Sequence, residues 1–164
     1  MKNYDVVKNF FNNRRGQNTK NLRIQYNLGS TDLVNYNTIL VHKEYQKIYV
    51  NISRYSVTTA IIQSYINDFL QYEAGTITYY YGNKYGDNYK DEADHVKFIA
   101  FFDCTNNSGY GIEKIENDTI KFRYTRFNML YNPEYRAIKI DRDGRPYFRF
   151  NKVKWYLDEI ERTM

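Results

Sequence analysis

Two alternating segments and one amphipathic segment follow each other within about forty residues, and together they leave this chain little freedom of fold. Residues 33–41 and 46–52 alternate apolar with polar side chains, which is typical of half-buried strands joined in a hairpin. Residues 57–70 instead repeat large apolar side chains at helical spacing. The members of that stripe are Ile62, Tyr65, Ile66, Phe69 and Leu70. The segment therefore predicts a hairpin that leads directly into an amphipathic helix.

Two polar clusters mark this hairpin and the start of its helix. The first lies inside the predicted strand 33–41 and consists of Tyr36, Asn37 and Thr38. The second joins the second strand to the helix and consists of Tyr55, Ser56, Val57, Thr58 and Thr59. The serine fits an N-cap, because its hydroxyl can accept a hydrogen bond from a backbone amide in the first turn. Capping accounts for the serine alone, and we expect the tyrosine and both threonines to pin the strand to the helix rather than to contact a ligand.

The order of these clusters resembles the signature of a small domain found in proteins of Gram-positive phages, plasmids and other mobile elements. Members of that group show a Ser-Tyr-Asn-Thr-like strand followed by Tyr-Ser-x-Thr-Thr and a helix, and the similarity here covers residues 22–70. Similar segments are attributed to some anti-CRISPR inhibitors of Cas9. The resemblance thus implies a mobile-element protein that inhibits a type II CRISPR nuclease. Because the net charge of +5 argues against imitation of target DNA, we expect stoichiometric binding that docks on a nuclease domain or blocks its movement.

The other segments predict an α+β fold, a mainly antiparallel sheet with two or three helices packed on it. Further helices are expected at residues 3–13 and 151–162, the second capped by Asn151. Further strands are expected at 22–28, 76–81, 96–102, 119–127, 136–141 and 145–150, with turns at 106–111 and 141–144. We expect a single domain over 1–164, with 22–75 as the strand-hairpin-helix module and 76–164 as a sheet-rich half.

Composition points to a soluble protein in the bacterial cytoplasm. Cys104 is the single cysteine, which excludes an intramolecular disulfide and fits a reducing compartment. No apolar run has the length of a signal peptide or a membrane span, so no membrane partner is expected. The excess of tyrosine and asparagine fits an AT-rich genome, and tyrosine is also good contact material for a binding surface.

The sequence offers little for catalysis, and we expect neither enzymatic activity nor a cofactor or metal. His42 lies at the predicted hairpin edge with no acidic companion except Glu44. His95 follows an acidic run, but the spacing matches no metal motif. The Asp-Arg-Asp-Gly run at 141–144 lacks the later glutamate of a calcium loop and is better explained as a turn.

Charge is segregated along the chain, and the acidic part lies in a long loop. Residues 1–75 carry a net charge of +4, residues 76–120 carry −4, and residues 121–164 carry +5. Residues 82–94 are polar without periodicity, and a loop of this length is often functional. We expect its acids and tyrosines to contact a basic surface of Cas9 or of another host defence nuclease. The expected partner-binding residues are Tyr80, Tyr81, Tyr85, Asp87, Tyr89, Asp91, Glu92 and Asp94.

An alternative reading is a nucleic-acid-binding accessory protein of a phage or plasmid. Basic residues alternate with aromatic ones in the C-terminal region, a combination that can bind single strands by phosphate contacts and stacking. A solvated sheet face explains the same pattern, so nucleic acid is a secondary partner. The candidate residues are Lys121, Arg123, Arg126, Lys139 and Arg149.

Overall fold

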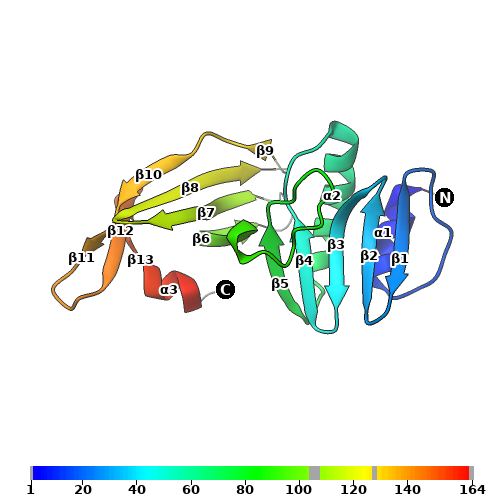
Figure 1. Cartoon of the computed structure of the whole chain (residues 1–164), viewed down its shortest axis with the longest axis horizontal. Helices are drawn as coiled ribbons and strands as arrows, with labels where there is room; N and C mark the ends of the chain where they lie inside the picture. The colour runs from blue at the N-terminus through cyan, green and yellow to red at the C-terminus, as the bar shows by residue number, and fades with distance from the viewer. Residues whose placement is uncertain (1, 104–107, 127–128, 163–164) are drawn as a thin grey trace.

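The chain has an α+β fold in which one long, mainly antiparallel sheet carries most of the strands (Figure 1). In the computed structural model the described residues are 2–103, 108–126 and 129–162. The strands of the long sheet follow the order β1-β2-β3-β4-β5-β6-β7-β8-β10, with β9 beside β8, while β11, β12 and β13 form a separate sheet. The strands are β1 (Leu22–Asn27), β2 (Ser30–Asn35), β3 (Thr38–Glu44), β4 (Lys47–Asn51), β5 (Thr76–Tyr80), β6 (His95–Asp103), β7 (Ser108–Glu116), β8 (Thr119–Arg126), β9 (Met129–Leu130), β10 (Glu134–Ala137), β11 (Lys139–Ile140), β12 (Pro146–Phe150) and β13 (Val153–Tyr156).

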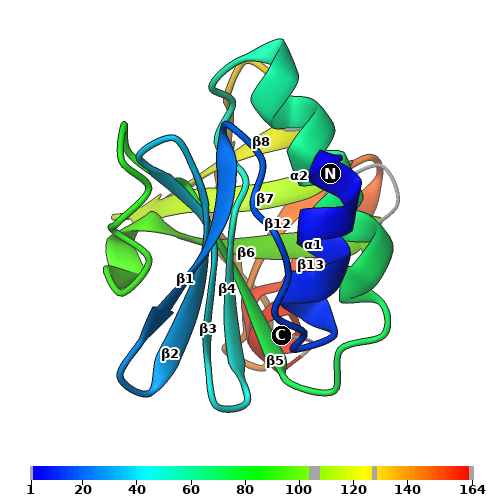
Figure 2. The same cartoon turned by 90° about the vertical axis from the view of Figure 1, so that its right-hand side faces the viewer.

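Two helices cover one face of strands β1 to β5, as Figure 2 shows. They are α1 (Asn3–Phe11) and α2 (Val57–Leu70), and the rings of Phe11 and Phe69 stack between them with centroids 5.6 Å apart. α2 also connects β4 to β5, which pair in parallel and therefore need a crossover between them. Helices and strands share one core, whose fully buried members include Val6, Val7, Leu22, Leu33, Val41, Ile52 and Ile62.

The predicted start of the central helix is confirmed. Ser56 is the N-cap of α2, and its Oγ accepts a hydrogen bond from the Thr59 amide at 3.2 Å. The apolar stripe predicted for this helix faces the core: Ile62, Ile66 and Leu70 are buried, and Tyr65 and Phe69 pack against them. The predicted first helix is confirmed as well, ending at Phe11.

The prediction of one strand over residues 33–41 is wrong, because the chain reverses there. Tyr36 and Asn37 form the turn between β2 and β3, and Tyr36 has a φ of 53°. Asparagine is common in such two-residue turns, and the turn carries Tyr36 out to the surface, where its side chain is 65% exposed. The first strand is also shorter than expected, since Leu28 lies fully exposed beyond the end of β1.

The C-terminal half has a second, smaller core between the long sheet and the separate one. Its buried members are Ile112, Ile120, Phe122, Phe148 and Phe150. The Arg136 guanidinium lies 5.6 Å from the ring centroid of Phe122 and 5.5 Å from that of Phe150, closing one side of this core. The two halves of the long sheet join through two residue pairs between β5 and β6, Tyr79 with Val96 and Tyr80 with His95.

The predicted helix at residues 151–162 is wrong over its first half. Asn151 and Lys152 have φ values of 51° and 65°, so they form a tight turn, and Val153–Tyr156 then pairs with β12 as β13. The β-branched and aromatic side chains of this segment favour a strand, and Trp155 Nε1 donates to the Phe150 carbonyl at 3.0 Å. Only α3 (Leu157–Arg162) is helical.

Three further predictions concern a strand and two turns of the C-terminal half. The strand expected at 136–141 is divided between β10 and β11, which belong to different sheets. The turn expected at 106–111 is wrong from Ser108 onward, where β7 begins, and its residues 106 and 107 lie outside the described residues, as does Cys104. The Asp-Gly turn is confirmed, with Gly144 at a φ of 78°. No helix within the described ranges is long and apolar enough to cross a membrane.

Candidate functional site

The loop that follows β5 folds back over the sheet face opposite the two helices, as Figure 2 shows. Its residues 82–94 run between β5 and β6 and end in a short 3-10 helix, η1 (Glu92–Asp94). The sheet face below it, which we call the loop-covered face, carries Asp32, His42, Tyr49 and Asn51 on β2, β3 and β4. The loop therefore packs on the sheet and does not extend into solvent.

The turn that carries the first polar cluster binds the loop backbone. Thr38 Oγ1 donates to the Lys84 carbonyl at 3.1 Å, and the next amide, that of Ile39, donates to the Tyr85 carbonyl at 2.9 Å. These contacts join residues more than forty positions apart in the chain. Thr38 thus attaches the loop to β3.

The second polar cluster reaches the same loop from the other side. Tyr55 donates its hydroxyl to the Asn83 carbonyl at 2.5 Å, and Ser53 Oγ donates to the Gly82 carbonyl at 2.8 Å. Burial raises the pKa of the Tyr55 phenol above its ordinary value. The interpretation of Tyr55 as a strand-to-helix pin therefore needs correction, because its hydroxyl attaches the loop.

The two threonines of this cluster have different roles. Thr59 fits the predicted pinning role, since its Oγ1 accepts from Asn35 Nδ2 at 3.0 Å and so links the helix to β2. Asn35 in turn accepts from Asn21 Nδ2 at 2.9 Å. Thr58 is exposed and lines a groove beside α1 instead.

Asn51 lies below the loop and binds four groups at once. Its Oδ1 accepts from the amides of Ser53 at 3.0 Å and Gly82 at 3.2 Å. Its Nδ2 donates to the Ile39 carbonyl at 3.0 Å and to the Tyr55 hydroxyl at 2.8 Å. With 1% of its surface exposed, Asn51 satisfies polar groups that would otherwise be buried without partners. Sequence reasoning missed it, because an asparagine in an alternating strand suggests a solvated side chain.

Tyr80 was expected to contact a partner, and the structure contradicts this. Its side chain is 0% exposed, and its hydroxyl donates to the Gly86 carbonyl at 2.8 Å from beneath the loop. Burial raises the pKa of this phenol above its ordinary value. Gly86 has a φ of 67° and packs directly on Asn51 and the Ile39 backbone, so the loop approaches the sheet as closely as a glycine allows.

A buried histidine–carboxylate pair lies under the end of the loop. His42 Nδ1 and Asp32 Oδ1 are 2.5 Å apart, and both residues are at most 5% exposed. The expectation that His42 has no acidic companion except Glu44 is therefore wrong, since the β2–β3 pairing places Asp32 opposite it. Tyr89 from the loop stacks on the imidazole with centroids 4.0 Å apart, which closes the pair off from solvent.

The remaining predicted contact residues divide between the interior and the surface. Tyr81 and Tyr89 are half-buried, and burial raises the pKa of both phenols. His95 Nε2 lies 2.6 Å from the Tyr89 carbonyl and holds the loop there. The outward side chains are those of Tyr85, Asp87, Asp91 and Glu92, while Asp94 is half-buried.

Hydrogen bonds within the loop set the positions of these acids. Asn83 Oδ1 accepts from the Tyr85 and Gly86 amides, and its Nδ2 donates to Asp87 Oδ1 at 2.9 Å. Asp91 Oδ1 accepts from the Ala93 amide at 3.1 Å and so caps η1. The arrangement presents a fixed acidic surface with one ring, that of Tyr85, 50% exposed beside it. Within the described ranges, no group of three or more His, Cys, Asp or Glu side chains is placed to hold a metal ion.

The basic residues predicted for nucleic acid do not form one surface. Lys121 and Arg123 share a face of β8, but both pair with Glu113 of β7, Lys121 Nζ at 3.2 Å and Arg123 Nε at 2.5 Å. Arg126 is exposed at the end of the same strand. Lys139 and Arg149 are exposed on the separate sheet, apart from Lys121 and Arg123 on β8.

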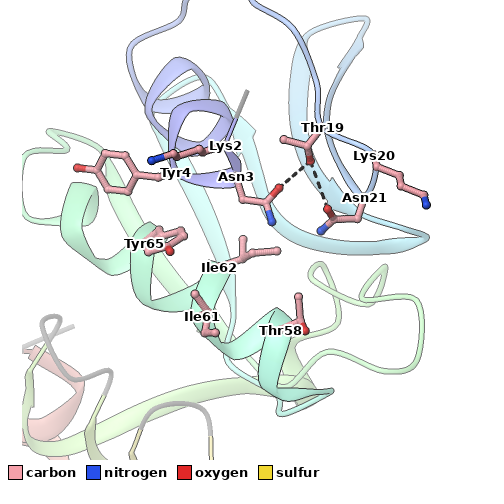
Figure 3. Close-up of a pocket in the computed structure, with 10 residues that line it drawn as sticks. All are labelled: Lys2, Asn3, Tyr4, Thr19, Lys20, Asn21, Thr58, Ile61, Ile62 and Tyr65. Atoms are coloured by element: carbon pink, nitrogen blue, oxygen red, sulfur yellow. Dashed lines mark hydrogen bonds between the residues drawn. The ribbon is translucent and has the colours of Figure 1, made fainter.

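A groove of about 570 Å³ lies on the helix side of the molecule, away from the loop (Figure 3). The N-terminus of α1, the segment before β1 and the outer side of α2 form its walls. Thr19 Oγ1 donates to Asn3 Oδ1 at 2.6 Å and ties two of these walls together. The side chains around the groove include Lys2, Tyr4, Lys20, Thr58, Ile61 and Tyr65.

No protein-family model, curated protein or solved structure matches this chain. Its function therefore has to be inferred from the geometry above and from the resemblance of the two polar clusters.

Proposed function

We propose that this protein is a non-catalytic binding protein of a mobile element, which inhibits a type II CRISPR nuclease by docking its 82–94 loop on a basic surface of that enzyme. The observation that carries the binding role is the attachment of this loop to the sheet by side chains of both polar clusters, Thr38 and Tyr55. A loop already held in one conformation loses little entropy when it binds, so more of its contact energy appears as affinity.

Charge favours a basic partner. The loop exposes three acids, Asp87, Asp91 and Glu92, against two cations, Lys84 and Lys90. Lys90 Nζ lies 4.0 Å from the carboxylate of Glu44 on β3, which leaves the exposed acids in excess. Cas9 holds its nucleic acids in positively charged channels, which are surfaces of the required sign. Complementary charge accelerates association and rejects acidic partners.

The proposal that this chain binds a protein and the proposal that this protein is Cas9 depend on different observations. The ordered acidic loop supports a protein partner with a basic surface. The choice of Cas9 depends on the resemblance of residues 22–70 to the mobile-element domain. The alternative of a nucleic-acid-binding protein that uses its C-terminal half loses support, because two of its candidate residues, Lys121 and Arg123, form ion pairs with Glu113.

The test compares inhibition of Cas9 cleavage by the wild type and by a loop variant that keeps the internal hydrogen bonds. In Asp87→Asn/Asp91→Asn/Glu92→Gln, each amide oxygen can still accept the bonds that hold the loop. Loss of three exposed negative charges should slow association and weaken inhibition by about tenfold or more. Cleavage of a matched target is measured at equal concentrations of each variant.

A matched control removes three exposed acids elsewhere. In Asp68→Asn/Asp118→Asn/Asp143→Asn the net charge changes equally, and inhibition should remain at the wild-type level. Undiminished inhibition by the loop variant would rule out this loop as the contact. If the wild type inhibits no type II nuclease, the Cas9 assignment fails, and binding to other basic proteins then tests the broader role.

A further inference from the structure

The entire net charge of the chain lies in its first thirty-one residues. Residues 1–31 contain six Lys or Arg side chains and one Asp, a net charge of +5, whereas residues 32–164 contain eighteen charges of each sign. The rest of the chain has no net charge because residues 32–120 carry −5 and residues 121–164 carry +5, so the N-terminal segment is one of two basic segments.

The fold gathers this segment at one end of the molecule. β1 is the edge strand of the long sheet, and α1 and residues 12–21 lie beside it, at the right of Figure 1. The six cations of this end, which we call the N-terminal basic surface, are all exposed: Lys2, Lys8, Arg14, Arg15, Lys20 and Arg23. Among the described residues none of them forms an ion pair, in contrast to Lys121 and Arg123 of the C-terminal half. Their charge is available to a partner.

Aromatic rings lie among these cations. The Arg15 guanidinium is 5.0 Å from the ring centroid of Tyr26, which is 52% exposed. At the opposite end of β1, Arg23 Nη1 donates to the Tyr36 carbonyl, and the Tyr36 ring is 65% exposed. β1 has six residues, so the two rings flank a strand about 20 Å long at about 3.3 Å per residue.

The groove of Figure 3 belongs to the same surface. Lys2 and Lys20 line it from α1 and from the segment before β1, and Tyr4 and Tyr65 contribute rings with centroids 5.3 Å apart. A concave site with aromatic walls and flanking cations suits a flat ring that carries a negative charge nearby.

We propose that the N-terminal basic surface binds single-stranded nucleic acid. Unpaired cations along one edge contact successive phosphates, and exposed rings beside them stack on bases, which are the two elements of sequence-tolerant single-strand binding. In a duplex the faces of the bases are stacked on neighbouring base pairs, so they cannot stack on the exposed tyrosine rings. This function is additional to the docking of the acidic loop, since the two surfaces share no residue.

The test measures binding of a fluorescein-labelled oligothymidylate of about twenty nucleotides by fluorescence anisotropy. We expect the wild type to bind, with an affinity that falls as salt rises. The variant Arg14→Gln/Arg15→Gln/Lys20→Gln/Arg23→Gln should lose about 0.7 units of the log–log salt slope for each of its four phosphate contacts. The matched control Lys139→Gln/Arg142→Gln/Arg149→Gln/Lys152→Gln removes the same charge from exposed positions on and beside the separate sheet. It should bind as the wild type does.

A second variant tests stacking without disturbing the fold. Tyr36→Asn removes a ring at a position whose φ of 53° suits asparagine, and it should weaken binding by about tenfold. The proposal is overturned by an absence of binding at low salt, by equal losses in the two quadruple variants, or by equal affinity for a duplex of the same length. Binding to anionic vesicles with no binding to the oligonucleotide would also overturn it.

Discussion

The two halves of the long sheet are stabilised in different ways. Strands β1 to β5 are covered on one face by two helices, and the 82–94 loop covers the other face over β2 to β4. Polar side chains such as Asn51 satisfy the buried backbone between loop and sheet. The C-terminal half has a small aromatic core and one guanidinium, that of Arg136, packed against it. Buried polar networks specify one arrangement of the groups they join. The difference indicates that the N-terminal half is built to hold a loop in place.

Of the substitutions considered, removal of the Asn51 side chain should lower the stability of the N-terminal half the most. Asn51→Ala leaves the buried amides of Ser53 and Gly82 without their acceptor, so we expect it to lower the free energy of unfolding by about 3 kcal/mol. Asn132→Ala, an exposed position in the C-terminal half, should change it by less than about 0.5 kcal/mol. Urea denaturation measures the free energy of unfolding of both variants. Equal losses would show that the polar network under the loop contributes no special stability.

Alkaline pH should weaken the packing of the 82–94 loop on the sheet. Burial raises the pKa of Tyr80 in the folded state, whereas the unfolded phenol ionises near its ordinary pKa of 10.0. Above about pH 10 the unfolded state therefore binds fewer protons, and stability falls as pH rises, by up to about 1.4 kcal/mol per pH unit for one such group.

Tyr80→Phe provides the control for this pH dependence. The variant should be less stable than the wild type near neutral pH, because it loses the hydrogen bond to Gly86, and its stability should fall less steeply above pH 10. Denaturation midpoints across the alkaline range give both slopes. Parallel slopes for the two proteins would show that Tyr80 does not titrate as proposed.

The smallest effect is expected at the helix cap. Ser56→Ala should cost about 1 kcal/mol of stability, the usual loss for an N-cap, while partner affinity stays nearly unchanged. Thermal unfolding and the cleavage assay measure the two quantities. A large loss of inhibition in a stably folded variant would show that Ser56 contacts the partner.

Local patterns predicted most elements, and two of the failures share a physical cause. α1 and α2 were predictable because apolar spacing and an N-cap act within a few residues. Both failures lie at turns whose residues have positive φ. At Tyr36 the turn lies inside an alternating pattern that continues on either side, and at Asn151 the turn residue was interpreted as a helix N-cap. Apolar periodicity reports burial, and it does not report a reversal of the chain.

The site was harder to predict than the fold, because its contacts join distant segments. Thr38 and Lys84 are forty-six positions apart, and nothing in either neighbourhood indicates the bond between them. The pairing of Asp32 with His42 depends on the register of β2 and β3, which the mistaken single strand concealed. Exposed acids such as Glu92 were predicted correctly as surface residues, since charge alone favours that position.

The narrow joint between β5 and β6 has a consequence for synthesis of the protein. All of the strands and helices of the N-terminal half precede residue 81, so they leave the ribosome before β6 does. Until His95 and Val96 emerge and pair with Tyr80 and Tyr79, β5 is an unpaired sheet edge on a nascent chain. Such edges are sites of intermolecular pairing during translation. The polar 82–94 loop is made in this interval, and in the folded structure it lies over the sheet, where its Gly86 carbonyl accepts a hydrogen bond from the buried Tyr80 hydroxyl.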